Sequence, residues 1–147
     1  MWQPVIVESP YGNADPIEIL LNEAYLRDAL HDCLRQGEAP YASHELYTLP
    51  GVLRDDDPEE RRMGIEAGFA IGRLFPRRVF YVDRGVSVGM IKGAQEARRL
   101  NQEMITRSLS REAWRNNAKV DMTAFMTQHN LWDELPHDLA LLLQLTR

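Results

Sequence analysis

The sequence contains a single cysteine, Cys33, among its 147 residues. One cysteine excludes an intramolecular disulfide framework and is typical of a reducing compartment. No uninterrupted apolar run approaches the ~18 residues that a membrane-spanning helix needs. The first residues, MWQPVIVESP, lack the basic and long apolar regions of a secretory signal. We therefore expect a cytoplasmic protein that does not use a membrane as a partner.

Positive charge is also in short supply, because 17 Lys and Arg residues stand against 22 Asp and Glu residues and give a net charge of −5. Nucleic-acid polymers are bound through a basic surface, so DNA and RNA are not expected partners. A small nucleotide remains compatible, since helix N-termini and a few side chains can hold it. The chain also lacks a phosphate-loop motif, a nucleophile elbow and metal-type Cys/His spacing, so neither a metal nor a cofactor is expected.

Short apolar, β-branched runs alternate with helical patterns over much of the chain. Strands are predicted at residues 5–7, 39–43, 79–82 and 103–106, and helices at 16–35, 58–74 and 88–100. This alternation predicts right-handed β-α-β units in a small Rossmann- or flavodoxin-like α/β fold, with a mostly parallel sheet flanked by helices. We assign residues 1–107 to this domain and residues 108–147 to a helical tail that packs on the domain or on a partner subunit.

Two of the predicted helices begin with the same local signal. Asp15 and Asp57 each precede a proline, so each aspartate is expected to be an N-cap and each proline the first helical residue. The first of these helices should end before Gly37. Its buried side is expected to be supplied largely by Leu20, Leu21, Ala24, Leu30, Cys33 and Leu34.

The helix after Asp57 has a glycine at every fourth position, namely Gly64, Gly68 and Gly72. Each glycine costs roughly 1 kcal/mol relative to alanine inside a helix. Three of them on one face therefore indicate that a backbone or a ligand comes close. The apolar stripe beside this bare strip is expected to consist of Met63, Ala67, Ala70 and Leu74.

Glu66 is predicted at the margin of that apolar stripe, on the side away from the glycines. A carboxylate at the edge of a buried face is a candidate functional acid. The alternative is a partly exposed glutamate in a salt bridge. The preceding run Asp55–Asp57 could hold a cation, although Asp57 is already accounted for as a helix cap.

The unusual polar residues gather where predicted strands end. In open parallel sheets, ligands bind at the carboxyl ends of the strands. The candidate catalytic and binding residues in these loops, or at the start of the following helix, are Ser9, Tyr11, Gly12, Ser43, His44, Asp55, Asp83, Ser87, Gly89 and Met90. The start of the last helix could receive a phosphate, because its free N–H groups favour an anion. An ordinary serine cap at Ser87 is the alternative.

Glycosyl transfer would suit such a set of residues. It needs a carboxylate that attacks or stabilises an oxocarbenium-like carbon, an acid that helps the base to leave, and polar groups that hold the sugar. Glu66 on a rigid helix, Tyr11, and Asp83 or Asp55 supply these residue types.

Three segments, SPYGN, MGIEAGFAIG and YVDRGVSVGM, together resemble the nucleoside 2-deoxyribosyltransferase-like superfamily. The similarity covers roughly residues 4–107 and is greatest to small phage and actinobacterial members with the patterns SPY, ASH-x-LYT, GVL-x-DDDPEER and GIEAG. It implies that Glu66 is the nucleophile, that Tyr11 holds the sugar and the nucleophile, and that Ser87 and Gly89 contact a 5′-phosphate. The chain departs from the family in lacking an aromatic residue before Glu66 and a clear match to the family's aspartate pair.

The leading hypothesis is a nucleoside or nucleotide N-glycosyl enzyme with Glu66 as nucleophile, Tyr11 as its orienting partner and Asp83 or Asp55 as an acid near the base. Whether water or another base is the acceptor stays open. A catalytically silent nucleotide-binding protein, or a phage-type inhibitor of a host protein, is the alternative. Cleavage of a dinucleotide such as NAD by the same glutamate is a third hypothesis.

The tail differs in character from the rest of the chain. Short helices are predicted at residues 110–117, 121–130 and 136–145. The run DLALLLQL is apolar enough to require burial, either against the sheet domain or in a homo-oligomer.

Overall fold

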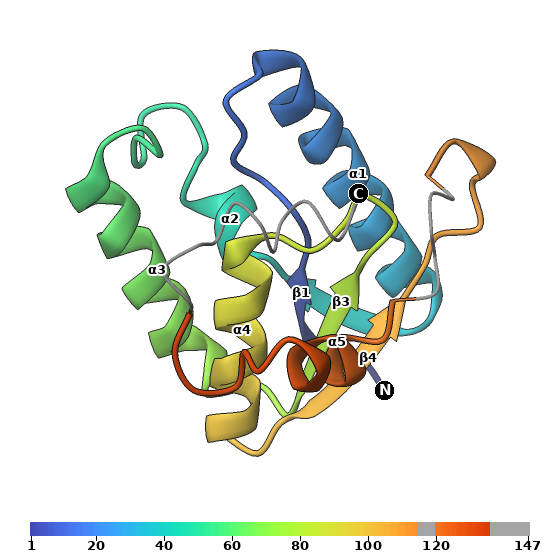
Figure 1. Ribbon diagram of the computed structural model, residues 1–147. Helices are drawn as coiled ribbons and strands as arrows, with labels where there is room; N and C mark the ends of the chain where they lie inside the picture. Colours follow the sequence, from blue (N-terminus) through green and yellow to red (C-terminus); the bar gives the residue numbers. More distant parts are fainter. Residues whose placement is uncertain (115–119, 136–147) are drawn as a thin grey trace.

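Four parallel strands form the central sheet of the computed structural model, which describes residues 1–114 and 120–135 (Figure 1). The strands are β1 (Gln3–Glu8), β2 (Glu38–Tyr41), β3 (Arg77–Tyr81) and β4 (Glu103–Arg107), in the spatial order β2-β1-β3-β4. The helical elements are α1 (Pro16–Arg35), α2 (Ser43–Leu46), α3 (Pro58–Gly72), α4 (Val88–Arg99), the 3₁₀ turn η1 (Glu112–Trp114) and α5 (Met122–Gln128). The predicted Rossmann- or flavodoxin-like α/β fold is confirmed.

The helix starts follow the local signals in the sequence. The Asp15 carboxylate accepts a hydrogen bond from the Ile17 N–H at 2.9 Å, and the Asp57 carboxylate accepts one from the Glu59 N–H at 2.9 Å. Gly37 follows α1 with a φ of 79°, a left-handed conformation that suits glycine. The predicted N-caps and the end of α1 are therefore confirmed.

Successive side chains of the strands enter two separate cores. Val79 and Tyr81 of β3 belong to a core with Tyr25 and Leu26 of α1. Phe80, on the opposite side of the same strand, belongs to a core built largely from α4 and α5. The sheet is thus covered on both faces, with α1 on one side and α4 and α5 on the other (Figure 1).

The expected buried side of α1 is largely wrong. Leu20 and Leu34 are 64% and 48% exposed, while Cys33 is buried as predicted. The buried face instead carries the residues Asn22, Tyr25, Leu26, Ala29 and Cys33. This face can be buried because the polar atoms of Asn22 and Tyr25 have hydrogen-bond partners just after β3. The Tyr25 hydroxyl donates to Asp83 at 2.6 Å, and Asn22 accepts from Arg84 at 2.8 Å.

The expected apolar stripe on α3 is also wrong, because Met63, Ala70 and Leu74 are exposed. The expectation of close approach at the glycines holds for Gly68 and Gly72, which are the buried residues of this helix, but the atoms that approach them belong to side chains rather than to a backbone or a ligand. A Cβ atom at Gly68 would lie only 2.8 Å from Ser43 Cβ, so α2 packs directly against the bare strip of α3.

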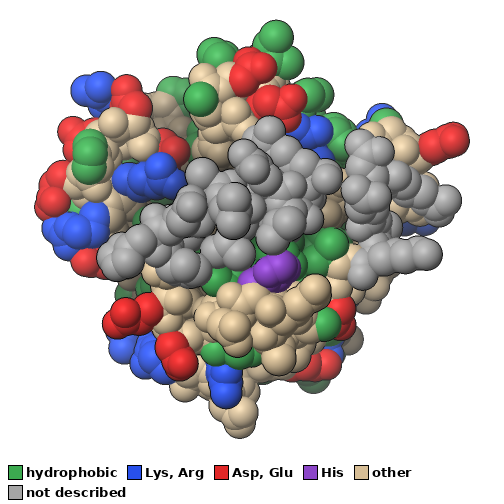
Figure 2. Space-filling model, viewed as in Figure 1, with side chains coloured by type: hydrophobic (Ala, Val, Ile, Leu, Met, Phe, Trp, Pro, Cys, Tyr) green, Lys and Arg blue, Asp and Glu red, His purple; other side chains and the backbone are tan. Residues whose placement is uncertain are grey.

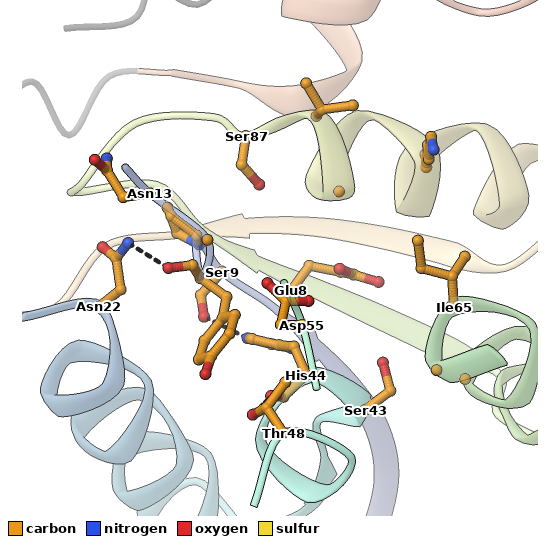
Figure 3. A pocket seen from close by; sticks show the side chains of 18 of the residues that line it. Glu8, Ser9, Asn13, Asn22, Ser43, His44, Thr48, Asp55, Ile65 and Ser87 are labelled. Carbon is orange, nitrogen blue, oxygen red and sulfur yellow. Dashed lines mark hydrogen bonds between the residues drawn. The ribbon is translucent and has the colours of Figure 1, made fainter. Parts of the chain in front are cut away.

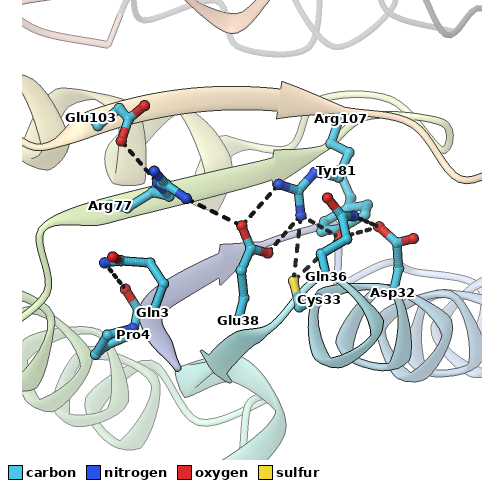
Figure 4. Close-up of polar contacts among 10 residues, drawn as sticks. All are labelled: Gln3, Pro4, Asp32, Cys33, Gln36, Glu38, Arg77, Tyr81, Glu103 and Arg107. Atoms are coloured by element: carbon cyan, nitrogen blue, oxygen red, sulfur yellow. Dashed lines mark hydrogen bonds and ion pairs between the residues drawn. The ribbon is translucent and has the colours of Figure 1, made fainter. Parts of the chain in front are cut away.

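A polar network crosses the α1 side of the sheet (Figure 4). Arg107 donates to both carboxylate oxygens of Glu38, at 2.8 and 3.0 Å, and these hydrogen bonds hold the pKa of Glu38 below its usual range. Cys33 Sγ lies 3.2 Å from the Tyr81 hydroxyl, and burial raises the pKa of the thiol to about 11. Cys33 is therefore protonated at neutral pH and serves as part of the packing rather than as a nucleophile.

The described part of the tail packs onto the sheet domain. Met122, Phe125 and Met126 of α5 share a core with Phe80 and Met90. The helix predicted at 110–117 is represented in the described residues by the turn η1, and the helix predicted at 136–145 lies outside the described residues.

Charged side chains of both signs are interspersed on the face shown in Figure 2, where the described residues form no continuous basic patch. In residues 1–114 and 120–135, no helix has both the length and the apolar character that crossing a bilayer requires.

Candidate functional site

A cavity of about 910 Å³ opens where β1 and β3 end, between α1, α2, α3 and the start of α4. Its volume lies within the range of small-molecule sites. The predicted residues that line it are Ser9, Tyr11, Gly12, Ser43, His44, Asp55, Asp83, Ser87 and Gly89. The loops at the carboxyl ends of the strands therefore do bring most of the candidate residues together (Figure 3).

Glu66, the predicted nucleophile, does not line this cavity. Its side chain is 62% exposed and pairs with Arg62 one turn earlier in α3, at 2.6 Å. The residues of α3 that do reach the cavity wall are Glu60, Arg61, Gly64, Ile65, Gly68 and Phe69. Glu66 thus has the environment of the alternative considered above, an exposed glutamate in a surface ion pair.

A carboxyl group that the sequence analysis did not select, that of Glu8, lines the cavity at the end of β1. Its Oε1 accepts a hydrogen bond of 2.8 Å from Arg78 Nη1, and the two side chains are only 16% and 2% exposed. On its other side the Glu8 carboxyl group lies against Gly93 of α4, where an added Cβ would be 2.6 Å from Oε1. Glu8 is therefore held between an arginine and a bare patch of helix backbone.

Burial raises the pKa of Glu8 to about 7, because loss of hydration outweighs the opposing effect of the Arg78 guanidinium. At neutral pH the carboxyl group is therefore divided between its protonated and ionised forms. A group with such a pKa can act as a nucleophile, an acid or a base under physiological conditions.

Ser9 and His44 form a second polar pair in the cavity. Ser9 Oγ lies 2.9 Å from His44 Nε2, and the Tyr11 ring meets the imidazole edge-on at a centroid distance of 6.3 Å. Burial lowers the pKa of His44 to about 4, so the imidazole is neutral at pH 7. The pair brings hydrogen-bonding capacity to this wall without a charge.

Asp83 lines the cavity but is committed to structural hydrogen bonds. Its Oδ2 accepts from the Tyr25 hydroxyl at 2.6 Å and from the Leu109 N–H at 2.9 Å, and the residue is 2% exposed. These hydrogen bonds join β3, α1 and the segment after β4. Asp83 is thus better suited to holding the wall in place than to donating a proton to a leaving base.

The start of α4 also faces the cavity. Ser87 Oγ accepts a hydrogen bond of 3.2 Å from the Met90 N–H, as an ordinary N-cap does. Met90 is fully buried and does not line the cavity. The cations on this side are Arg84, which pairs with Glu18, and Lys92, for which the described residues show no ion pair.

Asp55 lies on the opposite rim, in the connector before α3. Its carboxylate pairs with Arg61 at 3.9 Å and lies beside Gly12, where an added Cβ would be 3.4 Å from Oδ2. Within the described ranges, no three His, Cys, Asp or Glu side chains are grouped so that they could hold a metal ion.

The sequence interpretation missed Glu8 and Arg78. Both appear as flanking charges of apolar strands, and they are 70 positions apart in the chain. The parallel register pairs Ile6 with Arg78 and Glu8 with Phe80, which places the two charged residues on one face of the sheet, diagonally across β1 and β3. A signal was available only in the combination of strand pairing and side-chain alternation.

Comparison with known proteins gives one family. A family model described as a domain of unknown function, DUF7768, matches residues 3–107. Neither the curated proteins nor the solved structures contain a match to the chain.

Proposed function

The chain belongs to the DUF7768 family, and for this member we propose that the cavity binds a nucleoside or nucleotide whose N-glycosidic bond the protein cleaves or transfers. The observation that carries the proposal is the Glu8 carboxyl group, which projects into a cavity of suitable size at the carboxyl end of a central strand. The motifs that resemble the nucleoside 2-deoxyribosyltransferase-like superfamily give it further support. We infer a cytoplasmic location, in keeping with the single buried cysteine.

Glu8 takes the role that the resemblance gives to Glu66, because Glu8 lines the cavity at the end of a central strand, whereas Glu66 does not line it. In its ionised form, the carboxylate attacks or stabilises the anomeric carbon of the sugar as the bond to the base breaks. The base leaves with the bonding electron pair and takes up a proton from solvent. Water or a second base then attacks the anomeric carbon and releases Glu8.

The remaining wall offers groups for the other parts of such a ligand. Tyr11, Phe69 and Trp114 provide ring surfaces against which a base can stack. The start of α4 and Lys92 provide N–H groups and a positive charge that suit a phosphate.

The test is to incubate the purified protein with nucleosides, 2′-deoxynucleosides, their monophosphates and NAD, and to measure free base by chromatography. Glu8→Gln should abolish product formation, whereas Glu66→Gln is a matched control that should retain it. Circular dichroism and thermal unfolding establish that both variants are folded. Loss of activity in Glu66→Gln with retention in Glu8→Gln would reverse the assignment.

The same mixtures separate the alternative function. A ligand-dependent rise in melting temperature with no free base and no transfer product would favour a nucleotide-binding protein without catalysis. If no compound in the panel raises the melting temperature and none yields a product, the proposal is overturned.

A further inference from the structure

Behind Glu8, two polar side chains connect the cavity to the C-terminal end of α3. Gln102 Nε2 donates to the backbone oxygens of Gly72 and Phe75, at 2.8 Å each. Gln102 Oε1 accepts from Arg78 Nε at 3.1 Å, and Arg78 Nη1 donates to Glu8 at 2.8 Å. The chain of hydrogen bonds therefore runs from the helix end through Gln102 and Arg78 to the cavity carboxyl.

Arg78 is enclosed to an extent that is unusual for arginine. It is 2% exposed, and the absence of a side chain at Gly72 makes room for it, since a Cβ there would lie 3.1 Å from Nη2. Within the described residues, Nη2 is buried without a hydrogen-bond partner. Burying a charged donor that is not satisfied is unfavourable, so packing alone is a poor explanation for an arginine at this position.

We propose that Arg78 and Gln102 are positioning residues that fix the orientation of the Glu8 carboxyl group and keep it able to ionise for the reaction. This inference rests on the proposed function, in which Glu8 reacts as a carboxylate. Gln102 holds the guanidinium plane from behind, and the guanidinium presents Nη1 to one carboxylate oxygen. The other oxygen, Oε2, makes no hydrogen bond within the described residues and is left for the ligand.

The other titratable groups around Glu8 do not take over this role. Lys92 of α4, His44 of α2, Asp55 of the connector and Tyr11 of the first loop line the same cavity. Among the described residues, Arg78 alone is hydrogen-bonded to the Glu8 carboxyl group.

Arg78 does have a second acidic neighbour, because its charge contributes to lowering the pKa of Glu96 on α4. Glu96, however, is hydrogen-bonded to Arg99 at 2.8 Å. Removal of Arg78 should therefore affect Glu8 far more than Glu96.

The direct test is a pH titration of the protein labelled with ¹³C at the glutamate carboxyl carbons, followed by NMR. The resonance that is absent in Glu8→Gln identifies Glu8, and its midpoint in the wild type should lie near 7. Arg78→Met should raise this midpoint by one unit or more, because burial then acts without an opposing charge. Gln102→Leu should raise it by less, since the charge stays but its orientation is no longer fixed.

Two further variants make the result specific. Arg77→Met is the matched control, because Arg77 precedes Arg78 in β3 but pairs with Glu38 and Glu103. It should leave the Glu8 midpoint unchanged. Arg78→Lys, which restores the charge without the forked geometry, should return the midpoint most of the way towards the wild-type value.

The outcomes distinguish this inference from the proposed function. An unchanged Glu8 midpoint in folded Arg78→Met would overturn the positioning role, whatever the substrate. Once a substrate is known, the ionisation limb of the kcat profile should move with the NMR midpoint while KM changes little. A midpoint that moves in a protein that cleaves no N-glycosidic bond would refute the function and would support the control of Glu8 by Arg78.

Discussion

Gly93 is the position at which a single methyl group should disturb the candidate site most. An added Cβ would lie 2.6 Å from Glu8 Oε1, 2.7 Å from its Cδ and 3.1 Å from Oε2, whereas real Cβ contacts under 3.0 Å are essentially never observed. The carboxyl group would have to move away from α4, which would disturb its hydrogen bond to Arg78. Overpacking of this kind typically costs about 1–3 kcal/mol, against a gain of up to about 1 kcal/mol from alanine in a helix interior.

Gly64→Ala provides the control for the effect on helix propensity. Gly64 also lies within a helix, but its nearest contact would be Leu53 Cδ1 at 3.4 Å, which is an ordinary van der Waals distance. In urea denaturation, Gly93→Ala should therefore be about 1–3 kcal/mol less stable than Gly64→Ala. The Glu8 midpoint should also move in Gly93→Ala and not in Gly64→Ala. Equal stability of the two variants, with an unmoved Glu8 midpoint, would refute the placement of Glu8 against α4.

Two other predictions concern α2. Gly68→Ala should destabilise the protein by about 1–3 kcal/mol in urea denaturation, because the new Cβ would lie 2.8 Å from Ser43 and would push α2 off α3; a change smaller than that of Gly64→Ala would contradict this packing. The pKa of His44 is lowered from 6.5 to about 4, so the unfolded chain binds this proton more tightly and the contribution of His44 to stability should fall as pH drops from 6.5 towards 4. The free energy of unfolding of the wild type and of His44→Asn should be measured by denaturation across this pH range, and the variant should lack this loss. If the free energies of the two proteins change in parallel with pH, His44 is not buried as described.

The order of the strands and of α1, α3 and α4 was predictable because its signals are local, whereas the short helix α2 was not predicted. An aspartate followed by proline marks the starts of α1 and α3, and a serine marks the start of α4. The runs of β1, β3 and β4 contain β-branched or aromatic residues, and the spacing of the strands leaves room for one crossover each. None of these inferences requires knowledge of what a helix packs against.

The faces of the helices were not predictable in the same way. On α1, the leucine-rich side looked more suitable for burial than the side that includes Asn22 and Tyr25. The structure buries the latter because Arg84 and Asp83 satisfy their polar atoms, and these partners lie 62 and 58 positions further along the chain. The expected position of Glu66 beside a buried face was wrong for a similar reason, since it depended on which side of α3 faces inward.

The glycine spacing of α3 correctly predicts that another group approaches this helix closely, but that group is a side chain of the protein itself. Gly68 receives Ser43, which begins the helix that carries His44, and Gly72 receives the guanidinium of Arg78. Gly93 on α4 does the same for the carboxyl group of Glu8. Gly68, Gly72 and Gly93 thus each make room for a polar side chain of the site. The spacing of the glycines indicates only that other groups pack closely against these helices. The parallel pairing of β1 and β3 brings Glu8 and Arg78 between the helices, so the strand register is what identifies the carboxyl group.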